Sequence, residues 1–307
     1  MLDIAHSTWR DHFARLDGAF APSTLRAYYA DVEHFETWCQ THAVLAFPVS
    51  VFDLCRYLEA DGHQSSPATV RRRLYAVRKV HRLLRLPDPT LDEDINIALR
   101  KVKRAKLGRP KQAKGLTADY LDQFIAVQPD TPWGWRNQAM LSLGYDVLTR
   151  RSELVALQTS DVVARRDGTL RVTVRRSKAD PFGMGRVAFT SRRTADHIQT
   201  WLAWRGPDIT PLFCGIYQGK PINRALEATF VKRLIKDAAR DVGLDPATVD
   251  SFSGHSMRVG AAQDLLTRGH DGIAIMRAGG WKSMGVLGRY LEYAEHNVWE
   301  TEPLARA

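Results

Sequence analysis

The sequence SGHSMRVGAA at residues 253–262 is followed, after a short intervening segment, by AGGWKSMGVLGRYLE at residues 278–292. The first stretch contains His255 and Arg258, whose spacing of three places both side chains on one face of a helix. Such a pair is weak evidence by itself, because about one His-x-x-Arg pair is expected by chance in this composition. The residues around it are needed to give it meaning.

Five more residues with suitable chemistry flank this pair along the chain. They are Arg150 and Glu153, then Lys178 in an expected turn between two strands, and then Trp281 and Tyr290, nine residues apart. Each alone has an ordinary structural explanation: a surface ion pair, a turn lysine, a core tryptophan and a packing tyrosine. Their order along the chain is the informative feature.

In this order the residues resemble the C-terminal signature of the tyrosine recombinases, also called phage-integrase-type recombinases. The sequence RRSEL at residues 150–154 matches the family's first motif, an arginine followed by x-[SA]-E-[LI]. Lys178 matches the family's β-turn lysine. The resemblance covers nearly the whole chain, and its specific motifs all lie in the C-terminal half.

Two departures from the family pattern affect the assignment. Trp281 stands where many members have histidine, and Leu148-Thr149 stands where Gly-Leu is usual. The second departure makes Arg151 an alternative to Arg150 as the first catalytic arginine. We prefer Arg150, because the glutamate of the motif then follows at the right spacing.

The resemblance implies a reaction in which Tyr290 attacks a DNA phosphodiester and forms a 3′-phosphotyrosyl link. Tyr293 is the nearest alternative hydroxyl. Arg150 and Arg258 would hold the non-bridging phosphate oxygens and neutralise the charge that develops in the transition state. Lys178 would protonate the departing 5′-oxygen.

Three further residues complete the set that the resemblance implies. His255 would donate to the same phosphate or help remove the proton of Tyr290. Trp281 would donate through its indole N–H, and Glu153 would orient Arg150 or His255. Neither a metal nor another cofactor is implied. The catalytic set is therefore Tyr290, Arg150, Lys178, His255, Arg258, Trp281 and Glu153.

The resemblance also implies partners: double-stranded DNA and further copies of the chain. Four protomers would act on two duplexes that carry an inverted-repeat target. The tail with Val298, Trp299 and Leu304 could form a helix that docks on a neighbouring protomer, or it could be a frayed terminus. Two other functions stay open: a DNA-binding or architectural protein that has lost catalysis, and a type IB topoisomerase.

The apolar spacing predicts a mainly α-helical chain with two domains. Residues 1–19 are expected to form an N-terminal leader and residues 20–106 a core DNA-binding domain of four or five helices. A basic linker containing Gly and Pro covers residues 107–115. Residues 116–307 form the predicted catalytic domain, which is mainly α with a small antiparallel β-sheet.

Helix starts are predicted from capping residues that precede an apolar repeat. Ser23 is a candidate cap for the first helix, and Ser66 with Pro67 opens a helix that lasts to about Leu86. Strands are predicted at 169–177 and 186–190, and helices at 23–38, 50–60, 67–86, 91–106, 117–127, 133–148, 194–204, 225–242, 255–268, 272–278 and 284–293.

The basic residues are concentrated in one segment. The chain has 44 Lys and Arg against 34 Asp and Glu, a net charge of +10. Between Thr69 and Lys111 there are fourteen basic and four acidic residues, so this segment holds the whole surplus. A polyanion-binding surface gives this pattern, and so does a solvated helix face. The candidate DNA-binding residues are Arg71, Arg78, Arg82 and Arg85, which a helical repeat places on one line, together with Lys101, Lys103 and Arg104.

Several classes of protein are disfavoured. The chain has no phosphate-loop, HExxH or GxSxG motif. Cys39, Cys55 and Cys214 have neither the number nor the spacing of a disulfide framework or a zinc site, so we expect reduced, buried thiols and no metal. The longest stretch without Asp, Glu, Lys or Arg, residues 37–52, is too short to span a membrane, and no secretion signal is recognisable. We therefore expect a cytoplasmic, nucleoid-associated protein.

Overall fold

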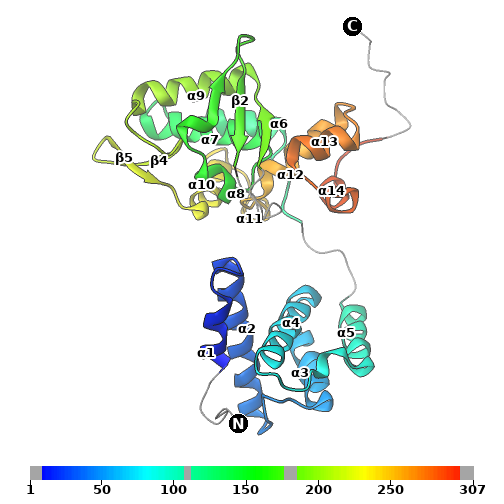
Figure 1. The fold of residues 1–307 in the computed structure, drawn as a ribbon. Helices are drawn as coiled ribbons and strands as arrows, with labels where there is room; N and C mark the ends of the chain where they lie inside the picture. Colours follow the sequence, from blue (N-terminus) through cyan, green and yellow to red (C-terminus); the bar gives the residue numbers. More distant parts are fainter. Residues whose placement is uncertain (1–8, 107–111, 176–184, 298–307) are drawn as a thin grey trace. The chain divides into compact units, whose positions relative to one another are not determined.

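A computed structural model describes residues 9–106, 112–175 and 185–297. The chain divides into two compact units, Met1–Pro110 and Lys111–Ala307. Both are mainly helical, and the second also contains two small antiparallel sheets (Figure 1). The predicted fold class, mainly α with a small antiparallel sheet in the C-terminal part, is confirmed.

The first unit is a set of helices in which one helix contacts all the others. Their bounds are α1 Trp9–Phe13, α2 Pro22–Thr41, α3 Val51–Gln64, α4 Pro67–Leu83 and α5 Glu93–Ala105, with 3-10 turns at Ala14–Leu16 and Pro89–Leu91. Helix α4 packs against α1, α2, α3 and α5. Its apolar stripe is therefore buried, whereas Arg71, Arg72 and Arg82 are exposed.

The predicted start of α4 agrees with the structure, and the predicted start of α2 does not. Ser66 caps α4, since its Oγ accepts the N–H of Thr69 at 3.2 Å, as expected. Helix α2 begins at Pro22, after Ala21, and the predicted cap at Ser23 is wrong. The proline already has the fixed φ that suits a first helical position, so the helix starts before the serine.

The segment expected to be a leader contributes to the core of the first unit. Trp9, Phe13 and Leu16 are buried in a cluster with residues of α2 and α4. The rings of Trp9 and Phe13 lie 5.0 Å apart, edge to face. Residues 9–16 are thus part of the packed helical unit, and residues 1–8 of the expected leader lie outside the described residues.

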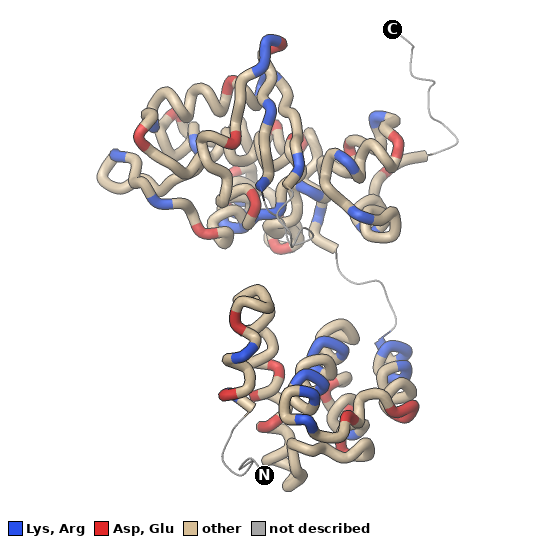
Figure 2. Tube along the Cα trace, viewed as in Figure 1, with Lys and Arg blue, Asp and Glu red and all other residues tan. Residues whose placement is uncertain are grey.

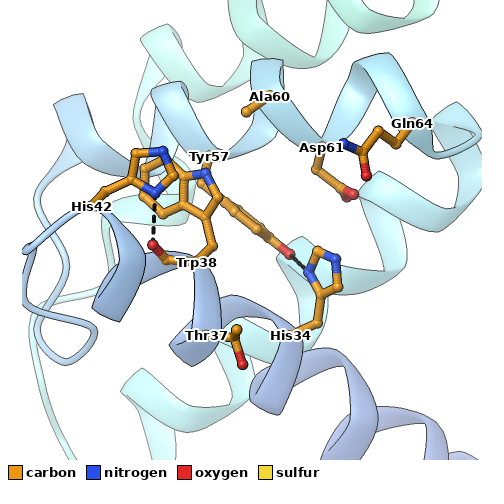
Figure 3. Close-up of a pocket in the computed structure, with 8 residues that line it drawn as sticks. All are labelled: His34, Thr37, Trp38, His42, Tyr57, Ala60, Asp61 and Gln64. Carbon is orange, nitrogen blue, oxygen red and sulfur yellow. Dashed lines mark hydrogen bonds between the residues drawn. The ribbon is translucent and has the colours of Figure 1, made fainter.

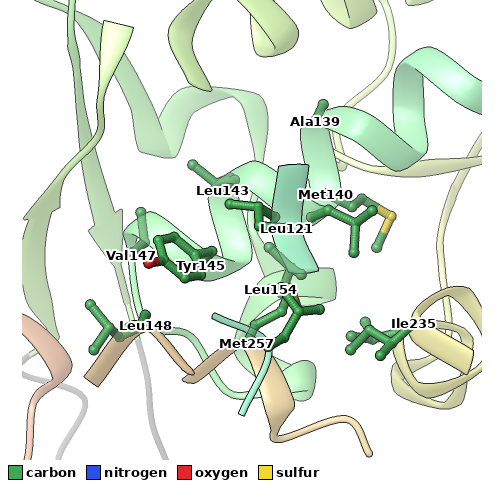
Figure 4. Packing of buried hydrophobic residues seen from close by; sticks show 14 of the residues in the cluster. Leu121, Ala139, Met140, Leu143, Tyr145, Val147, Leu148, Leu154, Ile235 and Met257 are labelled. Carbon is green, nitrogen blue, oxygen red and sulfur yellow. The ribbon is translucent and has the colours of Figure 1, made fainter. Parts of the chain in front are cut away.

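The second unit is built around α7, which packs against α6, α9 and α12. A Cβ at Gly144 of α7 would lie 2.6 Å from Cε of Met257, so the glycine permits a close approach of the first turn of α12. Figure 4 shows Met257 beside Leu154 in this core. The helices are α6 Ala118–Ala126, α7 Pro132–Asp146, α8 Arg151–Ala156, α9 Arg192–Arg205, α10 Ala228–Asp241, α11 Pro246–Ser251, α12 Ser256–Thr267, α13 Gly272–Gly279 and α14 Met284–Leu291, with a 3-10 turn at Thr159–Asp161.

Within the described residues, five strands form two separate sheets. Strands β1 Val162–Ala164, β2 Leu170–Val174 and β3 Arg186–Phe189 pair in that order, all antiparallel, and β4 Cys214–Tyr217 pairs with β5 Lys220–Ala225. Strands β2 and β3 were predicted, and β1, β4 and β5 were missed. Strand β1 has three residues, and nearly all of β5 is exposed, so neither shows the apolar alternation that marks a strand.

The missed strand β5 also explains an error in a neighbouring helix. The helix predicted at 225–242 begins at Ala228, because Ala225 is the last residue of β5. Short α8 and α11 contain too few residues to show a helical repeat. None of the helices within the described ranges is long and apolar enough to cross a membrane.

The three cysteines are free thiols, as expected. Cys39 and Cys214 are buried, and Cys55 is half-buried. Burial raises the pKa of the Cys39 thiol to about 12, so it stays protonated at neutral pH. These residues serve as small apolar groups in the two cores.

Candidate active site

Three predicted site residues from separate elements meet in the second unit. Arg258 on α12 is fully buried, and its guanidinium carbon lies 3.9 Å from the ring centroid of Trp281 and 5.7 Å from that of Tyr290. The centroids of the two rings are 5.0 Å apart, with their planes at 65°. Packing of α12 against α13 and α14 brings the tryptophan and the tyrosine to the arginine.

The cluster contains buried donors that the protein does not satisfy. Nη1 of Arg258 donates to the carbonyl oxygen of Leu148. Nε and Nη2 of Arg258 and the indole nitrogen of Trp281 are buried and have no acceptor among the described residues. Burial of such donors is costly, and phosphate oxygens are acceptors that would satisfy them. The cluster is therefore suited to bind an oxyanion.

Electrostatics at Arg258 reflect its burial. Desolvation, together with the Arg150 and Arg186 guanidinium groups, lowers the pKa of Arg258 to about 10, whereas Tyr290 and Glu153 act in the opposite direction. The group is still protonated at neutral pH. A cation held away from water interacts more strongly with a bound phosphate than an exposed one does.

Arg150 immediately precedes α8 and pairs with Glu153 in its first turn. Nη1 of Arg150 donates to Oε1 of Glu153 at 2.6 Å, and the Arg150 backbone N–H donates to Oε2 at 3.0 Å. The side chains are 18% and 2% exposed, whereas Arg151 is exposed. The pairing favours Arg150 over Arg151 as the site arginine.

The residue two positions before this motif has an unusual backbone. Leu148 has a φ of +49°, in the left-handed region that favours glycine. The conformation gives a physical reason for the glycine that the tyrosine recombinases usually have at this position. In this chain the leucine side chain is 2% exposed, and burial worth about 1.5–3 kcal/mol can offset a backbone strain of about 1–2 kcal/mol.

His255 stands directly before α12 and is solvent-exposed. Partial desolvation lowers its pKa, and so do the nearby Arg151, Arg258 and Arg150 guanidinium groups, with Glu153 opposing them. Its ordinary value of 6.5 is therefore an upper limit, and the imidazole is neutral at pH 7. A neutral imidazole can either donate a hydrogen bond or accept a proton.

Two predicted features lie outside the described residues. Lys178 belongs to the segment 176–184, and the tail with Val298, Trp299 and Leu304 belongs to 298–307. Tyr293, the alternative hydroxyl, is 51% exposed after the end of α14.

Sequence reasoning missed three residues that hold this cluster. Gln112 and Gln263 each place Nε2 3.4 Å from the backbone carbonyl oxygen of Tyr290. Arg186, the first residue of β3, donates to the carbonyl oxygens of Val147 and Ala278. Their acceptors are main-chain atoms, so no partner side chain marks them in the sequence.

The candidate DNA-binding arginines of the first unit are less uniform than the helical repeat suggested. Arg78 donates through Nε to Thr90 Oγ1 at 2.6 Å, and Arg82 donates to Asp88 at 3.2 Å. Arg85 follows the end of α4 and has a φ of +56°, so the expected line of four arginines stops before it. The alignment prediction is wrong at Arg85 because the helix ends at Leu83.

Basic residues nevertheless gather along α4 and α5 (Figure 2). Arg71 donates to the hydroxyl of Tyr75 at 2.9 Å, and Lys101 pairs with Glu59 at 3.0 Å. All four residues are exposed. Lys103 and Arg104 are exposed and have no ion-pair partner within the described ranges. These two are the most readily available cations of the predicted set.

The first unit also contains a cavity of about 390 Å³ between α2 and α3. Figure 3 shows His34 and Tyr57 in contact there, with Nδ1 of His34 3.1 Å from the tyrosine hydroxyl. Asp61 also lines the cavity, but it is engaged by Arg73. No predicted site residue lines it, so it does not belong to the candidate active site.

Comparison with known families assigns the chain. The phage integrase family matches residues 114–296, and the phage integrase N-terminal SAM-like domain matches residues 11–86. The chain belongs to the phage integrase family. The resemblance to tyrosine recombinases drawn from the motifs is thereby confirmed, and enzymes with that name are DNA strand transferases.

Relatives of this phage integrase family member span most of its length. It is 28% identical over 310 residues to the integrase/recombinase xerD homolog of Selenomonas ruminantium, which covers 95% of this chain and 87% of that protein. It is 26% identical over 295 residues to recombinase cre of Escherichia phage P1, covering 89% and 84%. Both are recombinases by name, and the match extends over both units.

Solved structures share the fold at low sequence identity. The Tn1549 transposon integrase in complex with transposon right end DNA has a TM-score of 0.67 at 13% identity, covering 92% of this chain and 94% of that one. A lambda integrase tetramer bound to a Holliday junction has a TM-score of 0.60 at 17% identity, covering 90% and 76%. The fold is thus that of the phage integrase family.

Proposed function

We propose that the protein is a site-specific DNA recombinase that cuts and rejoins DNA through a 3′-phosphotyrosyl intermediate on Tyr290. One observation carries the proposal: Arg258 and Trp281 present buried, unsatisfied donors beside the ring of Tyr290. A phosphate bound to these donors would lie next to the phenol. Family membership supports recombination as the reaction.

In the proposed step, the Tyr290 hydroxyl oxygen attacks phosphorus and the bond from phosphorus to the 5′-oxygen breaks. The phenol loses its proton, with His255 as the candidate acceptor, and the 5′-oxygen gains one from Lys178. A neutral phenol is a weak nucleophile, so the positive charge of Arg150 and Arg258 must stabilise the transition state. Attack by a free 5′-hydroxyl reverses the step and rejoins the strand.

The proposed step needs neither a metal ion nor ATP, because the phosphotyrosyl bond retains the energy of the phosphodiester that it replaces. Cleavage is therefore expected to continue in EDTA and without added nucleotide. Loss of cleavage in EDTA, with recovery on adding Mg²⁺, would contradict this part of the proposal.

The two units have separate proposed tasks. Residues 20–106, with the packed segment 9–16, would bind the DNA core site, and residues 116–307 would catalyse the reaction. The expected linker 107–115 would join the two, although Gln112 and Lys114 hydrogen-bond to the second unit and belong to it in the structure. The partner is double-stranded DNA with an inverted repeat, and four protomers would act on two duplexes. The tail at 298–307 would dock on a neighbouring protomer. The lambda integrase tetramer on a Holliday junction supports this assembly as a model.

The test is capture of the covalent intermediate. Duplexes that contain candidate inverted repeats and a nick near the cleavage position trap the intermediate, since the short cleaved fragment diffuses away. The wild-type protein should give an adduct that survives SDS, and Tyr290→Phe should give none while still retarding DNA in a gel.

The same assay separates the other readings. An adduct that persists in Tyr290→Phe and disappears in Tyr293→Phe assigns the nucleophile to Tyr293. Retarded DNA without any adduct would indicate an architectural protein. Relaxation of supercoiled plasmids that lack the target would indicate a type IB topoisomerase.

A further inference from the structure

Arg186 joins two segments that carry different candidate site residues. Its side chain is 14% exposed, and Nη1 donates to the carbonyl oxygen of Ala278 at 2.8 Å. Nη2 donates to the carbonyl oxygen of Val147 at 2.7 Å. Val147 lies just before the Arg150 motif, and Ala278 lies three residues before Trp281. One planar guanidinium thus fixes the separation of these two segments.

The same guanidinium lies close to the groups that hold Arg258 and Arg150. Nη2 of Arg186 is 3.5 Å from the Leu148 carbonyl oxygen, which also accepts from Arg258. It is 4.0 Å from Oε2 of Glu153, the carboxylate that pairs with Arg150. Arg186 therefore shares the Leu148 carbonyl with Arg258 and the Glu153 carboxylate with Arg150.

The aliphatic part of Arg186 packs against the turn that leads to Trp281. Gly280 ends α13 with a φ of +67°, and a Cβ there would lie 2.7 Å from Cδ of Arg186. The glycine thus provides both the left-handed conformation and the space for the arginine stem. The turn and the arginine are fitted to each other.

We propose that Arg186 is a positioning residue for the strand-transfer reaction. It holds the Val147–Leu148 backbone and the end of α13 so that Arg150, Arg258 and Trp281 converge on one phosphate. It contacts none of the reacting atoms itself. The inference rests on the proposed function, since it concerns the same phosphate.

Partial burial of the Arg186 guanidinium costs free energy of desolvation. Desolvation lowers its pKa, Arg150 lowers it further, and Glu153 opposes them. An apolar side chain at this position would avoid the desolvation of a cation. An apolar side chain could not, however, donate hydrogen bonds to the carbonyl groups of the two site segments.

A buried arginine elsewhere in the same unit provides the matched control. Arg205 is 3% exposed, and its Nη1 donates to Thr159 Oγ1, Ile209 O and Pro211 O at 2.7–2.9 Å. Burial lowers its pKa as well. Within the described ranges none of its hydrogen bonds reaches a candidate site residue. The guanidinium groups of both arginines are largely shielded from solvent and donate to main-chain carbonyls. The two arginines differ in the segments of chain that they hold together.

The experiment compares Arg186→Lys with Arg205→Lys in the full-length protein, on the nicked duplex that traps the adduct. Lysine keeps the charge, but a single ammonium cannot replace the planar fork. Both variants should unfold at a lower temperature than the wild type. Only Arg186→Lys should slow adduct formation at saturating DNA, by about 100-fold, as expected for a misplaced catalytic group. Its affinity for the DNA should be unchanged.

Each outcome bears on a distinct claim. If the wild type forms no adduct, the proposed function fails, whatever the variants do. If the wild type reacts and Arg186→Lys reacts at the same rate, the positioning role is wrong. Equal slowing by both lysine variants also contradicts it, because loss of stability would then explain the effect. Should Arg186→Lys not fold, Arg186→Gln is measured against Arg205→Gln with the same expectations.

Discussion

The basic residues of the two units differ in their surroundings. In the first unit Lys103 and Arg104 are exposed on α5 and have no ion-pair partner within the described ranges. In the second unit Arg258 is fully buried, with its pKa lowered to about 10. An exposed cation binds a polyanion weakly and is screened by salt, whereas a buried one acts strongly at a single position. The net charge of the chain is therefore related to the strength of DNA binding, and it gives little information about the catalytic residues.

The largest effect is expected from removal of the buried cation. Arg258→Met should slow adduct formation by about 10²–10³-fold, as for loss of one donor to a developing oxyanion. Its unfolding temperature should be no lower than that of the wild type, because burial of the guanidinium is costly. Single-turnover kinetics and thermal unfolding measure the two quantities.

Arg205→Met is the matched control for this variant, since it removes a buried arginine elsewhere in the unit. It should be less stable than the wild type, because the three hydrogen bonds from Nη1 of Arg205 are lost, whereas two donors of Arg258 have no acceptor to lose. It should react at the wild-type rate once folded. A large drop in the stability of Arg258→Met would contradict the view that this cation is kept for function.

The next effect concerns pH. Desolvation and the neighbouring guanidinium groups lower the pKa of His255 from its ordinary value of 6.5, so the neutral imidazole predominates at pH 7. If the neutral form takes the proton of Tyr290, the rate at saturating DNA should fall with decreasing pH in the acid range, as the imidazole becomes protonated. His255→Gln should be about 100-fold slower at pH 7 and lose this acid limb. An unchanged profile in the variant would assign the limb to another group.

A smaller effect is expected from the buried ion pair. Glu153→Gln leaves Arg150 without its carboxylate, and the free energy of unfolding should fall by about 2 kcal/mol in urea titrations followed by circular dichroism. Glu33→Gln is the control, because Glu33 forms an exposed pair with Arg10, both side chains being about half exposed. Its effect should stay below about 0.5 kcal/mol. Equal losses of stability in the two variants would contradict the expected difference between buried and exposed ion pairs.

The smallest effect is expected at the exposed cations. The double variant Lys103→Gln and Arg104→Gln should reduce the slope of log affinity against log salt by about two, if each residue contacts one phosphate. Its rate at saturating DNA should be unchanged. Arg56→Gln, which removes an exposed cation paired with Asp53, should leave the slope as it is. A slope unaffected by the double variant would place the DNA contact elsewhere.

The helices and the cluster of motif residues could be predicted because side-chain chemistry and spacing encode them. Arg258 lies on α12, Trp281 follows α13 and Tyr290 lies on α14, and the structure brings the three side chains together. Arg186 could not be predicted as a site residue. Its acceptors are main-chain carbonyls distant in sequence, and any residue can supply a carbonyl.

Other differences between the predicted and the observed structure also have local causes. Strand β5 is a nearly fully exposed strand, and it carries no apolar alternation. Arg85 was placed on the arginine line by helical spacing, but the chain leaves the helix at Leu83 and turns to a positive φ. Spacing arguments hold only as far as the element continues.

The carbonyl acceptors of Arg186 and Arg258 have a consequence for how the protein can diverge. A main-chain carbonyl cannot be deleted by substitution, so changes at Val147, Leu148 or Ala278 leave the anchoring atoms in place as long as the backbone path is kept. Mutational freedom at these positions is limited by backbone conformation and packing, and side-chain chemistry matters less. Variation around the arginines can therefore accumulate while the arginines themselves stay fixed, which is how a leucine can occupy the usual glycine position.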